Sequence, residues 1–268
     1  MQQFYIIEDR FKAVVIDYEY EYRIKFGGLK HCIDISVYKD DHDPNINGLS
    51  FNKKCSMNVD LVSGEGTIEM AKIAIKFVKT MFPETRNFMF KDHSKITCNK
   101  KIIVPLYYYY LIKHGQTWYQ SKFDAKLVIK EEQKLIDQLI FFMKNEPMLP
   151  LDEFYKEYIH KSRIANFKEF ISPTYNNSNS YYEFIKKLID NNDCGILQSW
   201  FSYFCSKHCQ FNFGESNWYI SSKTIDKWNV INYVETSNSF KFLKVQNAGA
   251  YKSYKVEDFI RKIKKKRQ

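Results

Sequence analysis

The sequence lacks a long hydrophobic run, and this excludes a membrane-spanning helix of ordinary length. The longest uncharged apolar stretch among the 268 residues covers residues 102–112, which is 11 residues, and it contains Pro105. A helix needs about 18 or more apolar residues to cross a bilayer. Glycine and proline are also scarce, at 9 and 6 residues, and charged residues make up 27% of the chain. These values exclude collagen-like and disordered chains and indicate a globular protein.

Cysteine is sparse for a chain of this length, which argues against a scaffold built on disulfides. The six cysteines are Cys32, Cys55, Cys98, Cys194, Cys205 and Cys209. The amino terminus also lacks the charged-then-apolar layout of a secretion signal, and thiols stay reduced inside most cells. We therefore expect free thiols in an intracellular protein.

Positive charge is concentrated at one end of the chain. The net charge is +10, and the tail formed by residues 261–268 is rich in lysine and arginine. The rest of the chain is close to neutral, unlike proteins whose fold itself is basic enough to bind nucleic acid. The tail is compatible with contact to a polyanion, with a nuclear address, or with a solvated chain end.

The first part of the chain alternates between polar and apolar residues, as half-buried strands do. Residues 18–26 and 29–37 flank Gly27-Gly28, which predicts an antiparallel hairpin. A third strand is predicted over residues 57–61, after a polar loop over residues 40–54. The face of the first predicted strand that we expect to be buried carries Tyr18, Tyr20, Tyr22, Ile24 and Phe26.

From Thr67 the apolar period lengthens to about three and a half residues, which predicts a helix over residues 67–82. Its opposite face carries Lys72, Lys76 and Lys79. A short strand over residues 87–90, a second helix over 105–119 and a strand over 123–129 are predicted to follow. This order of elements indicates an α+β fold.

The second half of the chain is predicted to be mostly helical with a few strands. We expect a domain over residues 1–130, a helical α+β appendage over 131–260, and the basic tail over 261–268. The predicted elements of the appendage are helices over 131–144, 151–170, 181–190 and 195–209, a loop over 172–180, and strands over 218–220, 230–234 and 240–245.

Two glycines, Gly64 and Gly66, separate the third predicted strand from the first helix. Glycine lets the backbone approach a ligand closely, and a helix N terminus presents free amides and the positive end of its dipole. The junction therefore suits a phosphate group, and a tight strand-to-helix turn is the alternative. The lysine of a nucleotide P-loop and the three-glycine dinucleotide fingerprint are both missing.

These residues and the elements around them resemble the GNAT acetyltransferase family. The fold of that family passes from an antiparallel hairpin to a bent strand, a glycine-bearing pyrophosphate loop, and then helix, strand, helix and strand. The family loop reads Gln or Arg, two residues, Gly, one residue, and Gly or Ala, and residues 61–66 read Leu-Val-Ser-Gly-Glu-Gly. A later family motif with Tyr and Phe is matched by Tyr119 and Phe123, with Lys122 in place of the family's Gly.

The resemblance implies a GNAT-like mixed sheet with flanking helices and an acyl-coenzyme A ligand, namely acetyl-coenzyme A. It implies that Tyr119 protonates the departing thiolate while an acetyl group passes to an amine. The candidates for a base that deprotonates the amine are Glu19, Glu21, Asp60 and Asp92. The alternative is that these carboxylates simply face solvent, as exposed carboxylates on an alternating strand usually do. The residues implied to hold the ligand's pyrophosphate are Val62, Ser63, Gly64, Glu65, Gly66 and Thr67.

Two departures from the family favour a form that binds the ligand without turnover. The two helices that shape the family's acceptor site have no room before Phe11, and Ile112 stands where the family has a helical Asn.

The sequence is also similar to uncharacterised proteins of giant DNA viruses over about residues 10–130. The similarity includes Asp92-His93-Ser94, Cys98, Thr117-Trp118-Tyr119 and Phe123-Asp124-Ala125. The bias toward Lys, Ile, Asn, Phe and Tyr fits an AT-rich genome. The similarity implies a protein of the host cytoplasm, of a viral factory, or of the virion.

A different class of function remains open, namely a non-enzymatic viral module. Such a module would bind a protein through Trp200, Trp218 or Trp228, or nucleic acid through the basic tail. Cys194, Cys205, His208 and Cys209 have a spacing that zinc can use. The same residues fit the buried face of a helix, and we expect no metal.

Overall fold

The computed structural model describes residues 2–7, 10–41, 43–57, 61–62, 64–98, 102–159, 166–191, 194–197, 199–209, 214–228, 240–246 and 250–252. The chain forms two compact units. Unit 1 comprises Met1–Phe90 and Tyr219–Gln268, and unit 2 comprises Lys91–Trp218. Unit 1 is therefore discontinuous, which differs from the expected division at residue 130.

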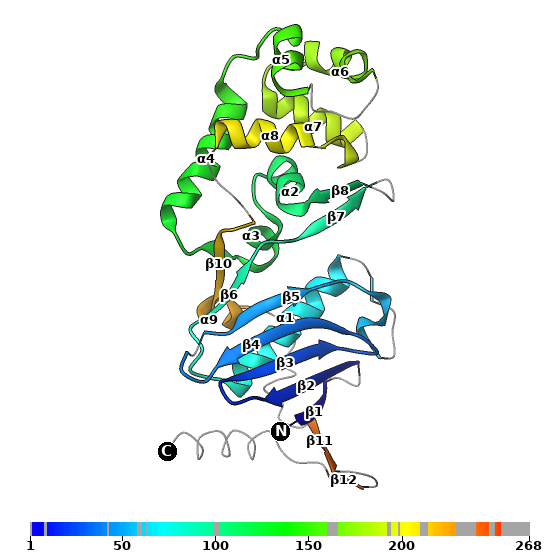
Figure 1. Cartoon of the computed structure of the whole chain (residues 1–268), viewed down its shortest axis with the longest axis vertical. Coiled ribbons are helices and arrows are strands. Elements are labelled where there is room, and N and C mark those ends of the chain that lie inside the picture. Colours follow the sequence, from blue (N-terminus) through cyan, green and yellow to red (C-terminus); the bar gives the residue numbers. More distant parts are fainter. Residues whose placement is uncertain are drawn as a thin grey trace. The chain divides into compact units, whose positions relative to one another are not determined.

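Unit 1 is built on a mixed sheet in which most neighbouring strands are antiparallel (Figure 1). Its strands lie in the order β12-β11-β1-β2-β3-β4-β5-β6-β10, and β5 and β6 are parallel. The late strand β11 pairs with β1, with Phe4 opposite Leu243, and this brings the end of the chain into unit 1. The strands are β1 (Gln2–Ile7), β2 (Phe11–Asp17), β3 (Glu21–Gly27), β4 (His31–Tyr38), β5 (Asn45–Leu49), β6 (Asn87–Lys91), β10 (Asn217–Ser221), β11 (Phe240–Gln246) and β12 (Ala250–Lys252).

The helix α1 (Glu65–Met81) covers one face of this sheet (Figure 1). Its apolar stripe is buried, as the sequence predicts, and the Phe77 ring lies 5.2 Å from that of Tyr5. The opposite face of α1, which carries Lys72, Lys76 and Lys79, also makes contacts within unit 1. Lys76 Nζ donates to the Trp228 carbonyl oxygen at 2.8 Å, and Lys79 Nζ to that of Ser222 at 3.2 Å, so α1 also holds the segment around α9 (Ser222–Asp226).

The predicted hairpin is present as β3 and β4, but its start is shifted. Tyr22 is buried as expected, whereas Tyr18 and Tyr20 lie in the β2–β3 turn and are 48% and 73% exposed. The strand before α1 also differs from the prediction. It is β5, in the stretch predicted as a polar loop, and its ladder with β4 supplies the backbone hydrogen bonds. Lys53–Cys55 form a short 3₁₀ helix, and residues 58–60 of the predicted third strand lie outside the described residues.

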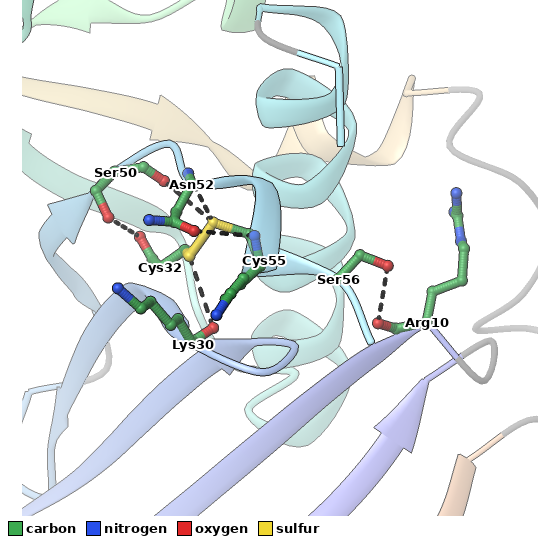
Figure 2. The surroundings of a disulfide bond; sticks show 8 residues. Arg10, Lys30, Cys32, Ser50, Asn52, Cys55 and Ser56 are labelled. Atoms are coloured by element: carbon green, nitrogen blue, oxygen red, sulfur yellow. Dashed lines mark hydrogen bonds between the residues drawn. A yellow bond between two sulfur atoms is a disulfide. The ribbon is translucent and has the colours of Figure 1, made fainter. Parts of the chain in front are cut away.

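The expectation of six free thiols is wrong. Cys32 forms a disulfide with Cys55, as Figure 2 shows, and Cys98 forms one with Cys194. The partners are 23 and 96 residues apart, so no spacing motif in the sequence indicates them. Cys205 and Cys209 are buried and form no disulfide.

Unit 2 combines a β-hairpin with a group of helices packed around aromatic side chains. Phe154 is fully buried, and its ring lies 4.9 Å from that of Tyr175. Phe184 is also fully buried, and its ring lies 4.9 Å from that of Tyr175. The elements are β7 (Lys95–Cys98), β8 (Ile102–Pro105), α2 (Leu106–His114), α3 (Trp118–Phe123), β9 (Lys126–Leu127), α4 (Lys130–Asn145), α5 (Leu151–Tyr158), α6 (Phe167–Asn176), α7 (Tyr181–Asn191), the 3₁₀ helix Cys194–Ile196 and α8 (Ser199–His208).

Two boundaries in unit 2 differ from the sequence prediction. The predicted helix over residues 105–119 is interrupted at Gly115, whose positive φ of 71° ends α2. The predicted loop over 172–180 begins too early, because α6 continues through Pro173 to Asn176. Within the described parts of the chain, no helix is both long and apolar enough to cross a membrane.

Candidate functional site

The glycine-bearing start of α1 has the local geometry of a tight helical entry. Gly64 adopts a φ of +87° and is exposed, with open space around its α-carbon. Few residues other than glycine adopt this conformation without strain. The Gly66 N–H donates to the Val62 carbonyl oxygen at 3.1 Å, and the Ile68 N–H donates to that of Gly64 at 3.1 Å. The first turn of hydrogen bonds thus begins at Val62.

This geometry changes the expected role of Gly66. Its amide is already engaged by Val62, and a β-carbon built on it would lie 3.3 Å from the Leu61 side chain. Gly66 is therefore buried against Leu61, and it is not the open position that the sequence predicts. Any side chain at this position would require Leu61 to shift by a few tenths of an ångström.

The other residues of the expected phosphate loop differ in exposure. Val62 is 69% exposed and Glu65 is exposed, while Thr67 is buried at 8%. Ser63 lies outside the described residues. Glu65 places a carboxylate in the first turn of α1, where it stabilises the helix dipole and would oppose a bound anion.

The segment that precedes the glycines is held by the Cys32–Cys55 disulfide and by backbone bonds (Figure 2). The Lys30 N–H donates to the Lys54 carbonyl oxygen at 2.9 Å, and the Met57 N–H donates to that of Arg10 at 2.7 Å. Arg10 in turn forms an ion pair with Glu69 of α1 at 2.8 Å. Residues 50–57 are thus fixed to β4, to the β3–β4 turn and to Arg10, which directly precedes β2 and is paired with α1.

Unit 2 brings together two residues that the sequence named separately, Asp92 and Tyr119. Asp92 follows β6 and is fully buried. Tyr119 lies in α3 and is 9% exposed, and its ring packs 4.8 Å from that of Trp118. Burial raises the pKa of the Tyr119 hydroxyl, and the charge of Asp92 raises it further. Asp92 and the Tyr119 hydroxyl therefore interact electrostatically.

The carboxyl group of Asp92 is only partly satisfied. Its Oδ1 accepts from the Ser94 N–H at 3.1 Å and from the Ser94 hydroxyl, while its buried Oδ2 has no hydrogen-bond partner among the described residues. Burial raises the Asp92 pKa to about 6, although the Ser94 hydrogen bonds act in the opposite direction. Burial and Asp92 also raise the pKa of Tyr107 to about 12. Buried carboxyl groups with such a shift are typical of functional sites and also occur in structural networks.

The remaining candidate bases lie in unit 1 or outside the described residues. Glu19 lies in the exposed β2–β3 turn and Glu21 at the start of β3, both in unit 1. Asp60 lies outside the described residues. The glycines Gly64 and Gly66 belong to unit 1, and Tyr119 belongs to unit 2.

The candidate zinc set is not assembled. Cys194 is bonded to Cys98, and the described residues contain no group of metal-ligating side chains. His208 Nε2 lies 2.7 Å from the Tyr158 hydroxyl, and the His208 ring stacks 3.8 Å from that of Phe142. Burial lowers the His208 pKa, which favours the neutral form of this packed ring.

Comparison of the chain with protein-family models, with curated proteins and with solved structures finds no match.

Proposed function

We propose that this protein binds an acyl-coenzyme A at the start of α1, and that binding rather than acetyl transfer is its retained property. The observation that carries the proposal is the order of elements in unit 1. Antiparallel strands end in β5, α1 follows, and β6 returns parallel to β5. This is the order in which the GNAT-like resemblance implies a pyrophosphate loop and helix.

The pairing of β5 and β6 adds support. The register between them has Asn45 opposite Met89 and Ile46 opposite Phe90, while β5 continues to Leu49. We propose that this later part of β5 offers backbone groups to the pantetheine arm, and that the amides of Gly64 and Glu65 contact the pyrophosphate. The Gly66 amide takes no part because Val62 engages it.

Two observations favour binding over turnover. Tyr119 is 9% exposed, and a general acid must reach the atom that it protonates. A hydroxyl whose pKa is raised by burial also donates its proton to a thiolate reluctantly. We therefore propose that Tyr119→Phe leaves ligand binding unchanged.

Titration calorimetry with acetyl-coenzyme A tests the proposal. The Glu65→Gln variant tests in addition whether the affinity changes in the expected direction. Removal of the Glu65 carboxylate from the first turn of α1 should tighten binding roughly two- to fivefold, because a helix-terminal charge contributes about 0.3 to 1 kcal/mol. Glu153→Gln makes the same change in the first turn of α5 and should alter nothing. The absence of binding heat up to millimolar ligand, or equal effects of the two substitutions, would contradict the proposal.

A further inference from the structure

One end of the unit 1 sheet gathers residues from two separate segments. Glu21 lies opposite Tyr38 in the β3–β4 ladder. The Lys39 N–H donates to the Tyr20 carbonyl oxygen at 3.0 Å, and the Tyr18 N–H donates to that of Glu21 at 2.9 Å. These bonds hold the β2–β3 turn beside the residues that follow β4. We call this surface, formed by residues 17–22 and 38–41, the tyrosine end of the sheet.

Three large rings of this surface lie in solvent. Tyr20 is 73% exposed, Tyr18 is 48% exposed and Tyr38 is 42% exposed. Single exposed aromatic residues are ordinary, but several gathered on one surface are typical of interaction sites. Tyrosine suits such a site because it combines a large apolar ring with a polar hydroxyl.

The same surface is acidic in a chain that is basic as a whole. The net charge of the protein is +10, yet Lys39 is the one basic residue of these two segments. Among the described residues, the side chains of Glu19 and Asp40 have no ion-pair or hydrogen-bond partner, and both residues are exposed. The carboxylates of the tyrosine end are Asp17, Glu19, Glu21, Asp40 and Asp41.

Lys39 shows how this surface accommodates a cation. Its ammonium group donates to Asp17 Oδ1 at 2.7 Å and also to the Tyr18 carbonyl oxygen. It lies 4.9 Å from the centre of the Tyr22 ring, within the range of a cation–π interaction. A carboxylate, a carbonyl oxygen and an aromatic face thus hold one ammonium group within the surface itself.

We propose that the tyrosine end binds a peptide segment rich in lysine and arginine. The exposed rings would pack against the side-chain stems and cationic groups of the peptide, and Glu19 and Asp40 would supply the opposite charge. Nucleic acids and acidic peptides would be repelled by the same carboxylates. This inference does not depend on acyl-coenzyme A binding.

Fluorescence anisotropy with a labelled peptide of eight alternating lysines and arginines tests the proposal on the full chain. We expect saturable binding that weakens as salt increases, and no binding of a labelled octaglutamate or a single-stranded oligonucleotide at this surface. Tyr20→Ser should raise the Kd roughly three- to fivefold, whereas Tyr20→Phe, which keeps the ring, should stay within about twofold. Glu19→Lys with Asp40→Lys should weaken binding about tenfold or more.

Leu29→Ser is the matched control, because Leu29 is 70% exposed in the β3–β4 turn, beyond the opposite end of the same two strands. It should leave the Kd unchanged. The proposal is overturned if the cationic peptide does not bind, if Leu29→Ser and Tyr20→Ser weaken binding equally, or if the charge-reversed variant binds as well as the original protein. Circular dichroism of each variant confirms that the fold is retained.

Discussion

Asp92 is a buried carboxyl group, and only one of its two oxygens accepts hydrogen bonds from described residues. Its burial therefore makes the stability of unit 2 depend on pH. Its pKa is raised to about 6, whereas an Asp in an unfolded chain has a pKa of about 3.9. Because the folded pKa is the higher one, folding is favoured when Asp92 is protonated. The contribution of this group to stability is therefore greatest below about pH 4, and it falls by roughly 3 kcal/mol as the pH rises from about 4 to about 6.

Asp92→Asn should remove most of this dependence. The amide keeps an oxygen for Ser94 and carries no charge, so we expect the free energy of unfolding at pH 7.5 to rise by roughly 1 to 2 kcal/mol. Urea unfolding at a series of pH values between 4 and 8 measures the effect. Asp137→Asn, at an exposed position of α4, is the control and should change stability by less than about 0.5 kcal/mol. Equal pH profiles for the original protein and Asp92→Asn would show that the Asp92 carboxyl is not strained by its burial.

Individual side chains were predictable where a regular pattern fixed them. Ile24 and Phe26 are fully buried, as the alternation of residues 18–26 predicts. Tyr20 belongs to the same alternation but lies in a turn. The strand β2 (Phe11–Asp17) ends at Asp17 and β3 begins at Glu21, so residues 18–20 connect the two strands. Periodicity states which residues share a face, and it does not state where the strand begins.

The segment over residues 50–57 depends on a covalent link more than on regular secondary structure. The Cys32–Cys55 disulfide closes a loop of 23 residues, for which chain entropy predicts a stabilisation of about 3 kcal/mol. Cys32→Ser with Cys55→Ser should therefore destabilise unit 1 and accelerate hydrogen exchange in residues 50–57. Mass spectrometry of exchanged peptides localises the change.

Cys98→Ser with Cys194→Ser is the matched pair for this experiment, because it removes the disulfide of unit 2 and should leave exchange in residues 50–57 unchanged. Alkylation of the denatured, unreduced protein should label only Cys205 and Cys209. Labelling of Cys32 or Cys55 in that sample would contradict the pairing on which the prediction depends.

Helices and strands were predictable where their buried residues recur at a regular spacing along the sequence. The α1 helix carries an uninterrupted apolar stripe, and its predicted range of 67–82 is within two residues of the observed one. The strand β5 reads Asn-Ile-Asn-Gly-Leu, has no buried residue and contains a glycine. Its conformation is fixed by the ladders with β4 and β6. Pairing with distant strands does not require an alternation of polar and apolar residues in the sequence of β5 itself.

The division of the whole chain follows from pairings between its two ends. β11 joins the sheet beside β1, and the Ser222 N–H donates to the Arg86 carbonyl oxygen at 2.8 Å, next to β6 and β10. These contacts join residues more than a hundred positions apart. The sequence indicated strands near residues 218–220 and 240–245 but not their partners, so a boundary at residue 130 was the natural prediction. The relation of this fold to the GNAT family and the identity of the ligand remain predictions.

A discontinuous unit 1 makes a direct prediction about which piece of the chain folds alone. Residues 1–90 joined to residues 219–268 by a short Gly-Ser linker should unfold cooperatively and form the Cys32–Cys55 disulfide. The linker can be short because β6 and β10 are neighbours in the sheet. Near-ultraviolet circular dichroism on heating reports the loss of packed aromatic side chains.

Residues 1–130 form the comparison, since they follow the sequence-based boundary and lack β10, α9 and β11. Without them the edge of β1 is unpaired, and Lys76 and Lys79 of α1 lose their carbonyl partners. An unpaired strand edge favours aggregation, and an incomplete sheet packs less tightly. We therefore expect this piece to melt without a cooperative transition. A cooperative transition in residues 1–130 but not in the joined chain would show that the last fifty residues are dispensable for unit 1.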